Sequence, residues 1–222
     1  MEVGSYYGKE DVIKLLDQIG RNVRRRVRAY LLGGTVLTYL GLKDSTKDVD
    51  LVVENFQAYS EVVKALRKLK FVRKTKMKFV DLEGRIVDID YGKFVKLKLY
   101  EVMKKRSRLI GVFGNLEAYM LIPEHIVFYK AITPRERDID DIVLILKNIP
   151  VNWNILVRDA EEITRKELAE NPNPIILTYE LYVTFKRIRS MCPELIPLDI
   201  FSKIKRIGEK QFYYWLKRKE KQ

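Results

Sequence analysis

Apolar residues recur along the chain with two different spacings, one typical of helices and one typical of strands. In the first part of the sequence the two patterns alternate. They predict helices over 9–28, 35–41 and 56–69. They predict strands over 29–32, 49–54, 72–82 and 85–91, a basic segment 93–108 that starts with a helix, and a hairpin over 108–121. From Pro123 onward the spacing predicts helices over 123–132, 135–148, 153–169, 175–190 and 198–219.

The order of these elements predicts an α+β (α/β) fold. Strands and helices that alternate along a chain build a sheet with helices packed on it, whereas a run of helices alone builds a bundle. We therefore expect a mixed β-sheet flanked by helices over residues 1–122. A C-terminal helical domain is expected over residues 123–222.

The chain is strongly basic. Its 222 residues include 43 Lys and Arg against 30 Asp and Glu, which gives a formal net charge of +13. Such a charge favours polyanionic partners, with nucleic acid as the first candidate. The alternative is the Lys- and Glu-rich surface of a thermophilic protein, because charged residues make up 33% of the chain. Basic residues concentrate in 64–78 and in 203–222, where four aromatic residues at 212–215 fit either contact with bases or a core face with a solvated back.

Residue types that are nearly absent narrow the chemistry. The single cysteine, Cys192, excludes an internal disulfide framework and a cysteine-based zinc site, and it fits a reducing, cytoplasmic environment. The single histidine, His125, excludes a cage of several histidines and is expected to be structural. Any metal would be held by oxygen atoms, which points to magnesium or manganese. No apolar run approaches the ~18 residues of a membrane span, so we expect no membrane partner.

Paired acidic residues stand inside two predicted strands. Asp48 and Asp50 occur in "DVDLVV", and Asp88 and Asp90 occur in "VDID". Residues two apart on a strand point to the same side, so each pair shares a face. Carboxylates on one face repel each other unless a cation lies between them. If the two strands are neighbours, their carboxylates converge into a site for one or two divalent ions.

A pair of glycines precedes these acids. Gly33 and Gly34 end one strand and open a helix, where the backbone can approach a phosphate closely. Thr35 adds a hydroxyl at the same place. The pattern therefore predicts a phosphate site beside the carboxylates.

Together, Gly33-Gly34, a spacer of thirteen residues and the "DVD" at 48–50 resemble the signature of the polymerase-beta-like nucleotidyltransferases. The lead-in "STKDVDLVVE", with Thr46, is similar to the one found in these enzymes. The segment "LIPEHIVFYKAITPRERDIDDIVLIL" resembles the downstream helices of the minimal and abortive-infection toxin members. The resemblance covers about residues 10–147, and the last 75 residues match no family pattern.

The resemblance implies a role for each matching residue. Asp48 and Asp50 would bind Mg²⁺ or Mn²⁺, and Asp88 would be the third carboxylate, which also binds metal and activates the attacking hydroxyl. Asp90 is the alternative, and Asp88 fits the apolar-apolar-acid pattern better. The nucleotide, ATP or another NTP, would be contacted by Gly33, Gly34, Thr35, Thr46, Lys130 and Asp138. For Asp138 and Asp141 the alternative is a surface pair that answers Arg135 or Arg137.

Such enzymes transfer a nucleoside monophosphate from an NTP to a hydroxyl and release pyrophosphate. The preferred acceptor is RNA, with a tRNA 3′ end as the leading candidate. The first alternative is transfer to a protein hydroxyl, as in toxin–antitoxin systems, where an antitoxin or other protein partner would be expected. The second is a non-catalytic nucleic-acid-binding module that keeps only the fold.

Overall fold

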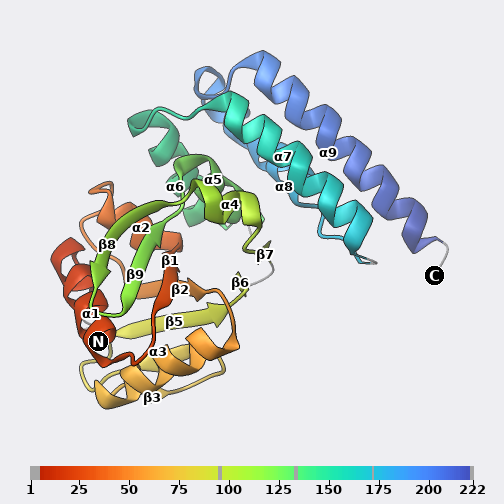
Figure 1. Ribbon diagram of the computed structural model, residues 1–222. Coiled ribbons are helices and arrows are strands. Elements are labelled where there is room, and N and C mark those ends of the chain that lie inside the picture. The colour runs from red at the N-terminus through yellow and green to blue at the C-terminus, as the bar shows by residue number, and fades with distance from the viewer. Residues whose placement is uncertain (1–5, 95–96, 133–134, 172, 221–222) are drawn as a thin grey trace. The chain divides into compact units, whose positions relative to one another are not determined.

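The computed structural model of the protein describes residues 6–94, 97–132, 135–171 and 173–220 (Figure 1). Contacts between residues divide the chain into two compact units, Met1–Ile122 and Pro123–Gln222. The first unit holds the sheets and the second unit is built from helices.

The N-terminal unit is built on a seven-stranded sheet with the strand order β3-β4-β5-β2-β1-β9-β8. Its strands are β1 (Val27–Leu31), β2 (Asp48–Val53), β3 (Val72–Arg73), β4 (Lys78–Val80), β5 (Ile86–Tyr91), β8 (Arg108–Phe113) and β9 (Leu116–Met120). Strand β2 is antiparallel to β1 and parallel to β5, and β1 is parallel to β9, so the sheet is mixed. The helices of this unit are α1 (Lys9–Asn22), α2 (Gly33–Tyr39), α3 (Phe56–Lys68) and α4 (Glu101–Arg106).

The two faces of this sheet differ in polarity because side chains alternate along each strand. One face carries buried apolar residues such as Leu31, Leu51 and Ile89. Helix α3 lies on this face, since its Tyr59 contacts the ring of Tyr91 on β5 with ring centroids 5.5 Å apart. Helix α1 packs against α3 and strands β8 and β9. Burial of these apolar residues fixes the register of the strands.

The opposite face carries most of the charged strand residues. Across the strands β4, β5, β2, β1 and β9 they are Lys78, Asp88, Asp90, Asp48, Asp50, Arg28 and Glu117. This polar face of the sheet is the surface on which the predicted carboxylates meet.

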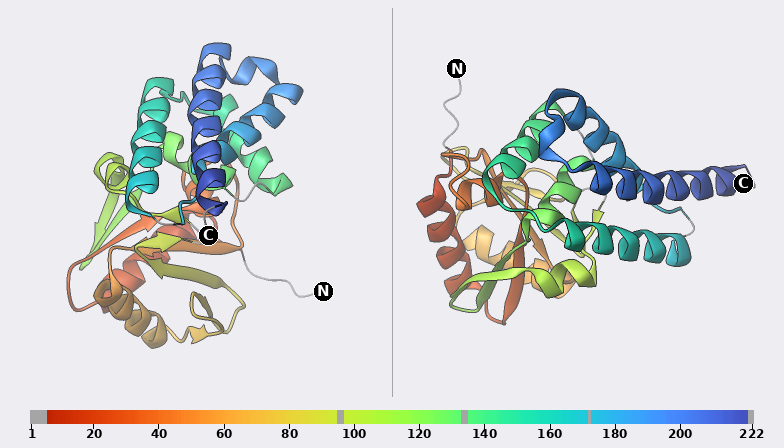
Figure 2. Two further views of the ribbon diagram at one scale, coloured as in Figure 1. Left: turned by 90° about the vertical axis from the view of Figure 1, so that its right-hand side faces the viewer. Right: turned by 90° about the horizontal axis from the view of Figure 1, so that it is seen from above.

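The C-terminal unit consists of helices among the described residues. They are α5 (Pro123–Ala131), α6 (Glu136–Asn148), α7 (Trp153–Glu170), α8 (Leu177–Met191), the short 3-10 helix Pro193–Leu195 and α9 (Leu198–Lys219). Helices α7, α8 and α9 pack on one another (Figure 2). The buried Gln211 of α9 accepts hydrogen bonds from the backbone N–H groups of Thr178 and Tyr179, which satisfies the start of α8.

The predicted α+β class, a mixed sheet flanked by helices and followed by further helices, is confirmed. No described helix is both long and apolar enough to cross a membrane. Three element boundaries differ from the prediction. Helix α1 ends at Asn22 rather than at residue 28, because Val27 already pairs with Leu116 in the sheet. The predicted strand 72–82 is split into β3 and β4. A small ribbon of β6 (Lys93–Phe94) and β7 (Leu97–Lys98) stands where a helix was expected to start.

Candidate active site

Three carboxylates converge on the polar face of the sheet. Asp48 and Asp50 belong to β2, and Asp88 belongs to its parallel neighbour β5, where it lies directly opposite Asp50. One oxygen from each of the three carboxylates can be chosen so that all lie within 4.8 Å of one another. Figure 1 shows β2 and β5 side by side in the middle of the sheet. The sheet register therefore produces the cluster that the resemblance implies.

The electrostatics of Asp88 fit a site for a cation. Its Oδ1 atom is buried and has no hydrogen-bond partner within the part of the chain that the structure describes. Burial raises the pKa of Asp88, the nearby Lys78 opposes this rise, and the charge of Asp48 adds to it. A buried carboxylate oxygen without a donor is unfavourable unless a cation or a donor group binds it. Three carboxylates match the oxygen ligands that Mg²⁺ and Mn²⁺ prefer, so the residues present fit a divalent ion.

The diglycine turn lies against this cluster. Gly33 follows β1 and has φ +57°, in the left-handed region that favours glycine. A Cβ atom at Gly33 would lie 2.0 Å from Oδ2 of Asp50. A Cβ atom at Gly34 would lie 2.9 Å from Oγ1 of Thr46. Both glycines therefore allow the backbone to pass close to the acidic strand.

Two threonines hold the backbone of β2 in place. The Thr35 hydroxyl accepts a hydrogen bond from the N–H of Asp50 at 2.8 Å and donates to the carbonyl of Asp48 at 3.3 Å. The Thr46 hydroxyl donates to the same carbonyl at 3.0 Å. Each hydroxyl has one proton to donate. The resemblance implies that these hydroxyls contact a phosphate. To donate to a phosphate, either hydroxyl would have to give up its hydrogen bond to the carbonyl of Asp48.

The alternative third carboxylate, Asp90, lies two residues after Asp88 on β5. It is opposite Val52, and its Oδ1 accepts a hydrogen bond from the N–H of Tyr91 at 2.9 Å. Among the described residues, the group of acids close enough to share an ion contains Asp88 and not Asp90.

The predicted nucleotide contacts Lys130 and Asp138 lie in the helical unit, on α5 and α6. The Lys130 amino group is 3.3 Å from Asp138 Oδ1 and 2.5 Å from Asp141 Oδ2, and all three residues are buried. Burial alone would raise the pKa of Asp138, but hydrogen bonding from Arg135 and the charge of Lys130 lower it. The two acids therefore form a buried ion cluster rather than a surface pair. Contact of Lys130 with a triphosphate stays a prediction.

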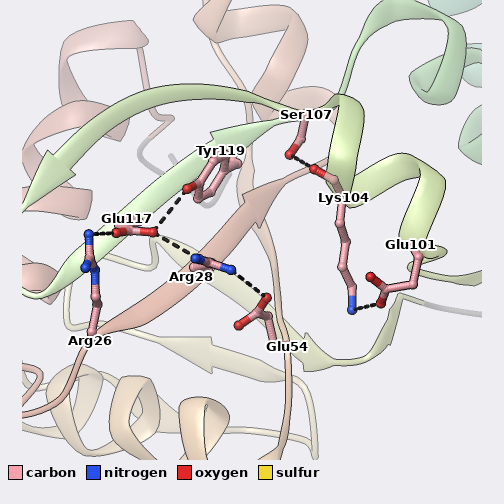
Figure 3. A network of polar contacts seen from close by, with 8 residues as sticks. All are labelled: Arg26, Arg28, Glu54, Glu101, Lys104, Ser107, Glu117 and Tyr119. Carbon is pink, nitrogen blue, oxygen red and sulfur yellow. Dashed lines mark hydrogen bonds and ion pairs between the residues drawn. The ribbon is translucent and has the colours of Figure 1, made fainter.

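A second polar network on the same sheet face was not anticipated from the sequence. Glu117 on β9 accepts hydrogen bonds from Arg28 and from the Tyr119 hydroxyl, both at 3.1 Å, and it also pairs with Arg26 (Figure 3). Arg28 extends the network to Glu54 at 3.6 Å. No local sequence signal marks this network, because its members lie on β1 and β9 or directly beside β1 and β2, strands that pair only in the folded chain.

Two other polar or aromatic groups belong to the helical unit. His125 Nε2 lies 2.9 Å from Asp159 Oδ2, and both side chains are fully buried.

The aromatic residues 212–215 of α9 are divided between two environments. Phe212 stacks on Tyr179 with ring centroids 4.3 Å apart, whereas Tyr213 and Tyr214 are 60% and 44% exposed. Part of the row thus belongs to a packed face and part to the surface.

No family model matches this chain, and no curated protein matches it. Among solved structures, it is similar to the crystal structure of an antigenic nucleotidyltransferase-like protein from Paracoccidioides brasiliensis. The two sequences are 13% identical, with a TM-score of 0.49 over 90% of this chain and 95% of that chain. A likeness of this degree establishes no shared activity, so the carboxylate site itself carries the functional conclusion.

Proposed function

We propose that the protein is a metal-dependent nucleotidyltransferase that moves a nucleoside monophosphate from an NTP to a hydroxyl group and releases pyrophosphate. The observation that carries this proposal is the meeting of Asp48, Asp50 and Asp88 on one sheet face, with mutual oxygen distances within 4.8 Å. The diglycine turn against Asp50 supports it, because nucleotide phosphates need close approach to the backbone at such a site.

Each residue of the site has a distinct task in this proposal. Asp48, Asp50 and Asp88 hold Mg²⁺ or Mn²⁺, which when bound neutralises phosphate charge and polarises the reacting phosphoryl group. Gly33 and Gly34 leave room for the triphosphate. Asp88 orients the acceptor hydroxyl and takes its proton. The hydroxyl oxygen forms a bond to the α-phosphorus, and the bond from that phosphorus to the oxygen bridging to the β-phosphate breaks.

The rate enhancement in such a reaction comes mainly from positioning and from charge neutralisation. The hydrogen bonds from Thr35 and Thr46 to the backbone of β2 serve positioning, because they fix Asp48 and Asp50 beside Gly33. Lys130 and Asp138 are proposed to add contacts to the nucleotide from the helical unit.

The acceptor proposed here is RNA, with a tRNA 3′ end as the first candidate. The net charge of +13 favours a polyanionic acceptor over a neutral one. A protein hydroxyl, in the manner of toxin–antitoxin systems, is the alternative acceptor, and a partner that neutralises the activity would then be expected.

One assay tests the function and its acceptor. The purified protein is incubated with α-labelled NTPs and Mg²⁺ together with either total RNA or cell protein. Label in RNA supports the proposed acceptor, and label in protein supports the alternative. Absence of label with every NTP and with both metals contradicts nucleotidyl transfer. The variant Asp48→Ala is expected to fold and to give no labelled product.

A further inference from the structure

A row of charged residues crosses the polar face of the sheet from the carboxylate site to the sheet edge. Asp50 on β2 is directly opposite Asp88 on β5, and Asp88 is directly opposite Lys78 on β4. The N–H of Lys74, just after β3, donates to the carbonyl of Lys78 at 2.9 Å. Residues opposite one another on adjacent strands share a face, so the row runs Asp50, Asp88, Lys78, Lys74.

The two ends of this row lie on opposite sides of the carboxylate site. Gly33 follows β1, which lies on the other side of β2 from β5. The three carboxylates therefore lie between the diglycine turn at one end and the two lysines at the other. Neighbouring strands are about 5 Å apart, so Lys78 starts about 5 Å and Lys74 about 10 Å beyond Asp88. If the nucleotide phosphates occupy the glycine end, the lysine end is left for the acceptor.

Both lysines have amino groups available for an anion. Within the part of the chain that the structure describes, neither amino group makes an ion pair within 4.0 Å or a hydrogen bond. Lys78 is half-buried, and Lys74 is exposed. The charge of Lys78 reaches Asp88. It offsets part of the rise that burial causes in the pKa of Asp88.

Neighbouring basic residues do not share this arrangement. The Arg73 guanidinium donates to the carbonyls of Thr75 and Lys76, and the Lys76 amino group lies 5.8 Å from the centroid of the Tyr91 ring. The acids of the turn between β4 and β5, Asp81 and Glu83, pair with Arg85.

An apolar surface adjoins the lysines. Val72 of β3 is opposite Val80 of β4, two residues along from the lysine pair and on the same face, and Val72 is 55% exposed. Cations that bind phosphates beside a surface that can contact sugars or bases are typical of sites for single-stranded nucleic acid. A protein hydroxyl or a small-molecule acceptor would need no such row of cations.

We infer that Lys78 and Lys74 bind the phosphodiester backbone of a single-stranded RNA acceptor next to the hydroxyl that receives the nucleotide. This inference rests on the proposed function and adds to it the path by which the acceptor reaches Asp88.

The test compares lysine variants in transfer to an unstructured oligoribonucleotide. Lys78→Gln and Lys74→Gln are each expected to raise KM for the RNA about three- to tenfold, while KM for the NTP changes less than about twofold. The dependence of log KM on log salt concentration should become shallower by about 0.7 for each lysine removed. Lys78→Arg keeps the charge and is expected to stay close to the unaltered protein.

The matched control is Lys68→Gln. Lys68 is also exposed, but it lies on α3, on the apolar side of the sheet, so its loss should change neither KM nor the salt dependence. The inference is overturned if the double variant Lys78→Gln/Lys74→Gln has the same KM for RNA as Lys68→Gln.

A binding measurement separates the inference from the proposed function. Fluorescence anisotropy of a labelled oligoribonucleotide, without metal or NTP, reports contact with the lysines even if no nucleotide is transferred. Weaker binding by the double variant than by Lys68→Gln supports the RNA path. Equal binding overturns it, whether or not the unaltered protein transfers nucleotides.

Discussion

The carboxylate of Asp50 fills the space that a side chain on Gly33 would need. A Cβ atom at Gly33 would come within 2.0 Å of Asp50 Oδ2, far inside van der Waals contact. Gly33 also has φ +57°, where other residues are strained. Because Gly33 has no side chain, the carboxylate of Asp50 can lie against it and face the site.

Replacement of Gly33 tests this relationship between Gly33 and Asp50. We expect Gly33→Ala to lower the free energy of unfolding by more than about 2 kcal/mol, because strain adds to the displacement of Asp50, and to remove nucleotide transfer. Thermal unfolding and the α-label assay measure the two effects. Gly84→Ala is the control, since Gly84 has φ +77° but open space around its Cβ position. It should cost about 1–2 kcal/mol and keep activity. Equal activity in the two variants would contradict the account.

The hydroxyl of Thr35 is expected to stabilise the acidic strand. Thr35→Val leaves the N–H of Asp50 without its buried acceptor, which should cost about 1–3 kcal/mol in urea unfolding. Thr38 lies on the same helix and is buried, but its hydroxyl has no hydrogen-bond partner among the described residues. Thr38→Val is therefore expected to be neutral or stabilising. A similar loss in both variants would show that these hydrogen bonds do not hold β2.

The network around Glu117 predicts an acid-sensitive contribution to stability. Burial would raise the pKa of Glu117, but hydrogen bonds from Arg28 and Tyr119 and the charge of Arg26 outweigh it, and the pKa is lowered. Stability from such a group is present above the pKa of the unfolded chain, about 4.3, and is lost as pH falls through the lower pKa of the folded state.

Glu117→Gln should therefore lower the free energy of unfolding at pH 7 by about 1–3 kcal/mol. The difference from the unaltered protein should shrink as the pH falls below about 4. Urea unfolding over a series of pH values measures both effects. Glu54→Gln is the control, because Glu54 is more exposed and lies 3.6 Å from Arg28. If the difference in the free energy of unfolding between Glu117→Gln and the unaltered protein does not change with pH, the lowered pKa of Glu117 is contradicted.

The buried cluster in the helical unit allows a test of the predicted role of Lys130. Lys130→Met leaves the buried Asp138 and Asp141 with less compensation and should cost about 3–5 kcal/mol. Lys130→Met/Asp141→Asn should recover much of this loss, because Asp138 keeps Arg135 at 2.6 Å. If Lys130 contacts the triphosphate, KM for the NTP stays raised in the double variant. A normal KM there would leave Lys130 a structural role only.

The residues alone predict the carboxylate face but leave Asp88 and Asp90 open as its third member. The family resemblance favours Asp88, which is the one found in the cluster. Alternation along a strand places Asp48 with Asp50 and Asp88 with Asp90 from local information alone. The choice between Asp88 and Asp90 depends on the register of β2 against β5, and more than thirty residues separate Asp50 from Asp88. Register is set by the burial of whole strands, so no local pattern carries it.

Other differences have the same physical origin. Val23 and Val27 fit the helical spacing of α1, yet Val27 joins the sheet through its pairing with Leu116 of β9. The burial of Lys130 depends on the packing of α5 against α6. The row from Asp50 to Lys74 appears only when the order of four strands is known.

The most direct test of the central claim compares two aspartates on the same strand. Asp88→Asn and Asp90→Asn remove the same charge two residues apart, and only Asp88 belongs to the carboxylate cluster. In the α-label assay with Mg²⁺ and RNA, we expect Asp88→Asn to reduce the rate at least about 100-fold, and Asp90→Asn to stay within about tenfold. Thermal unfolding confirms that both variants are folded. Full transfer by Asp88→Asn would contradict a metal site built from Asp48, Asp50 and Asp88.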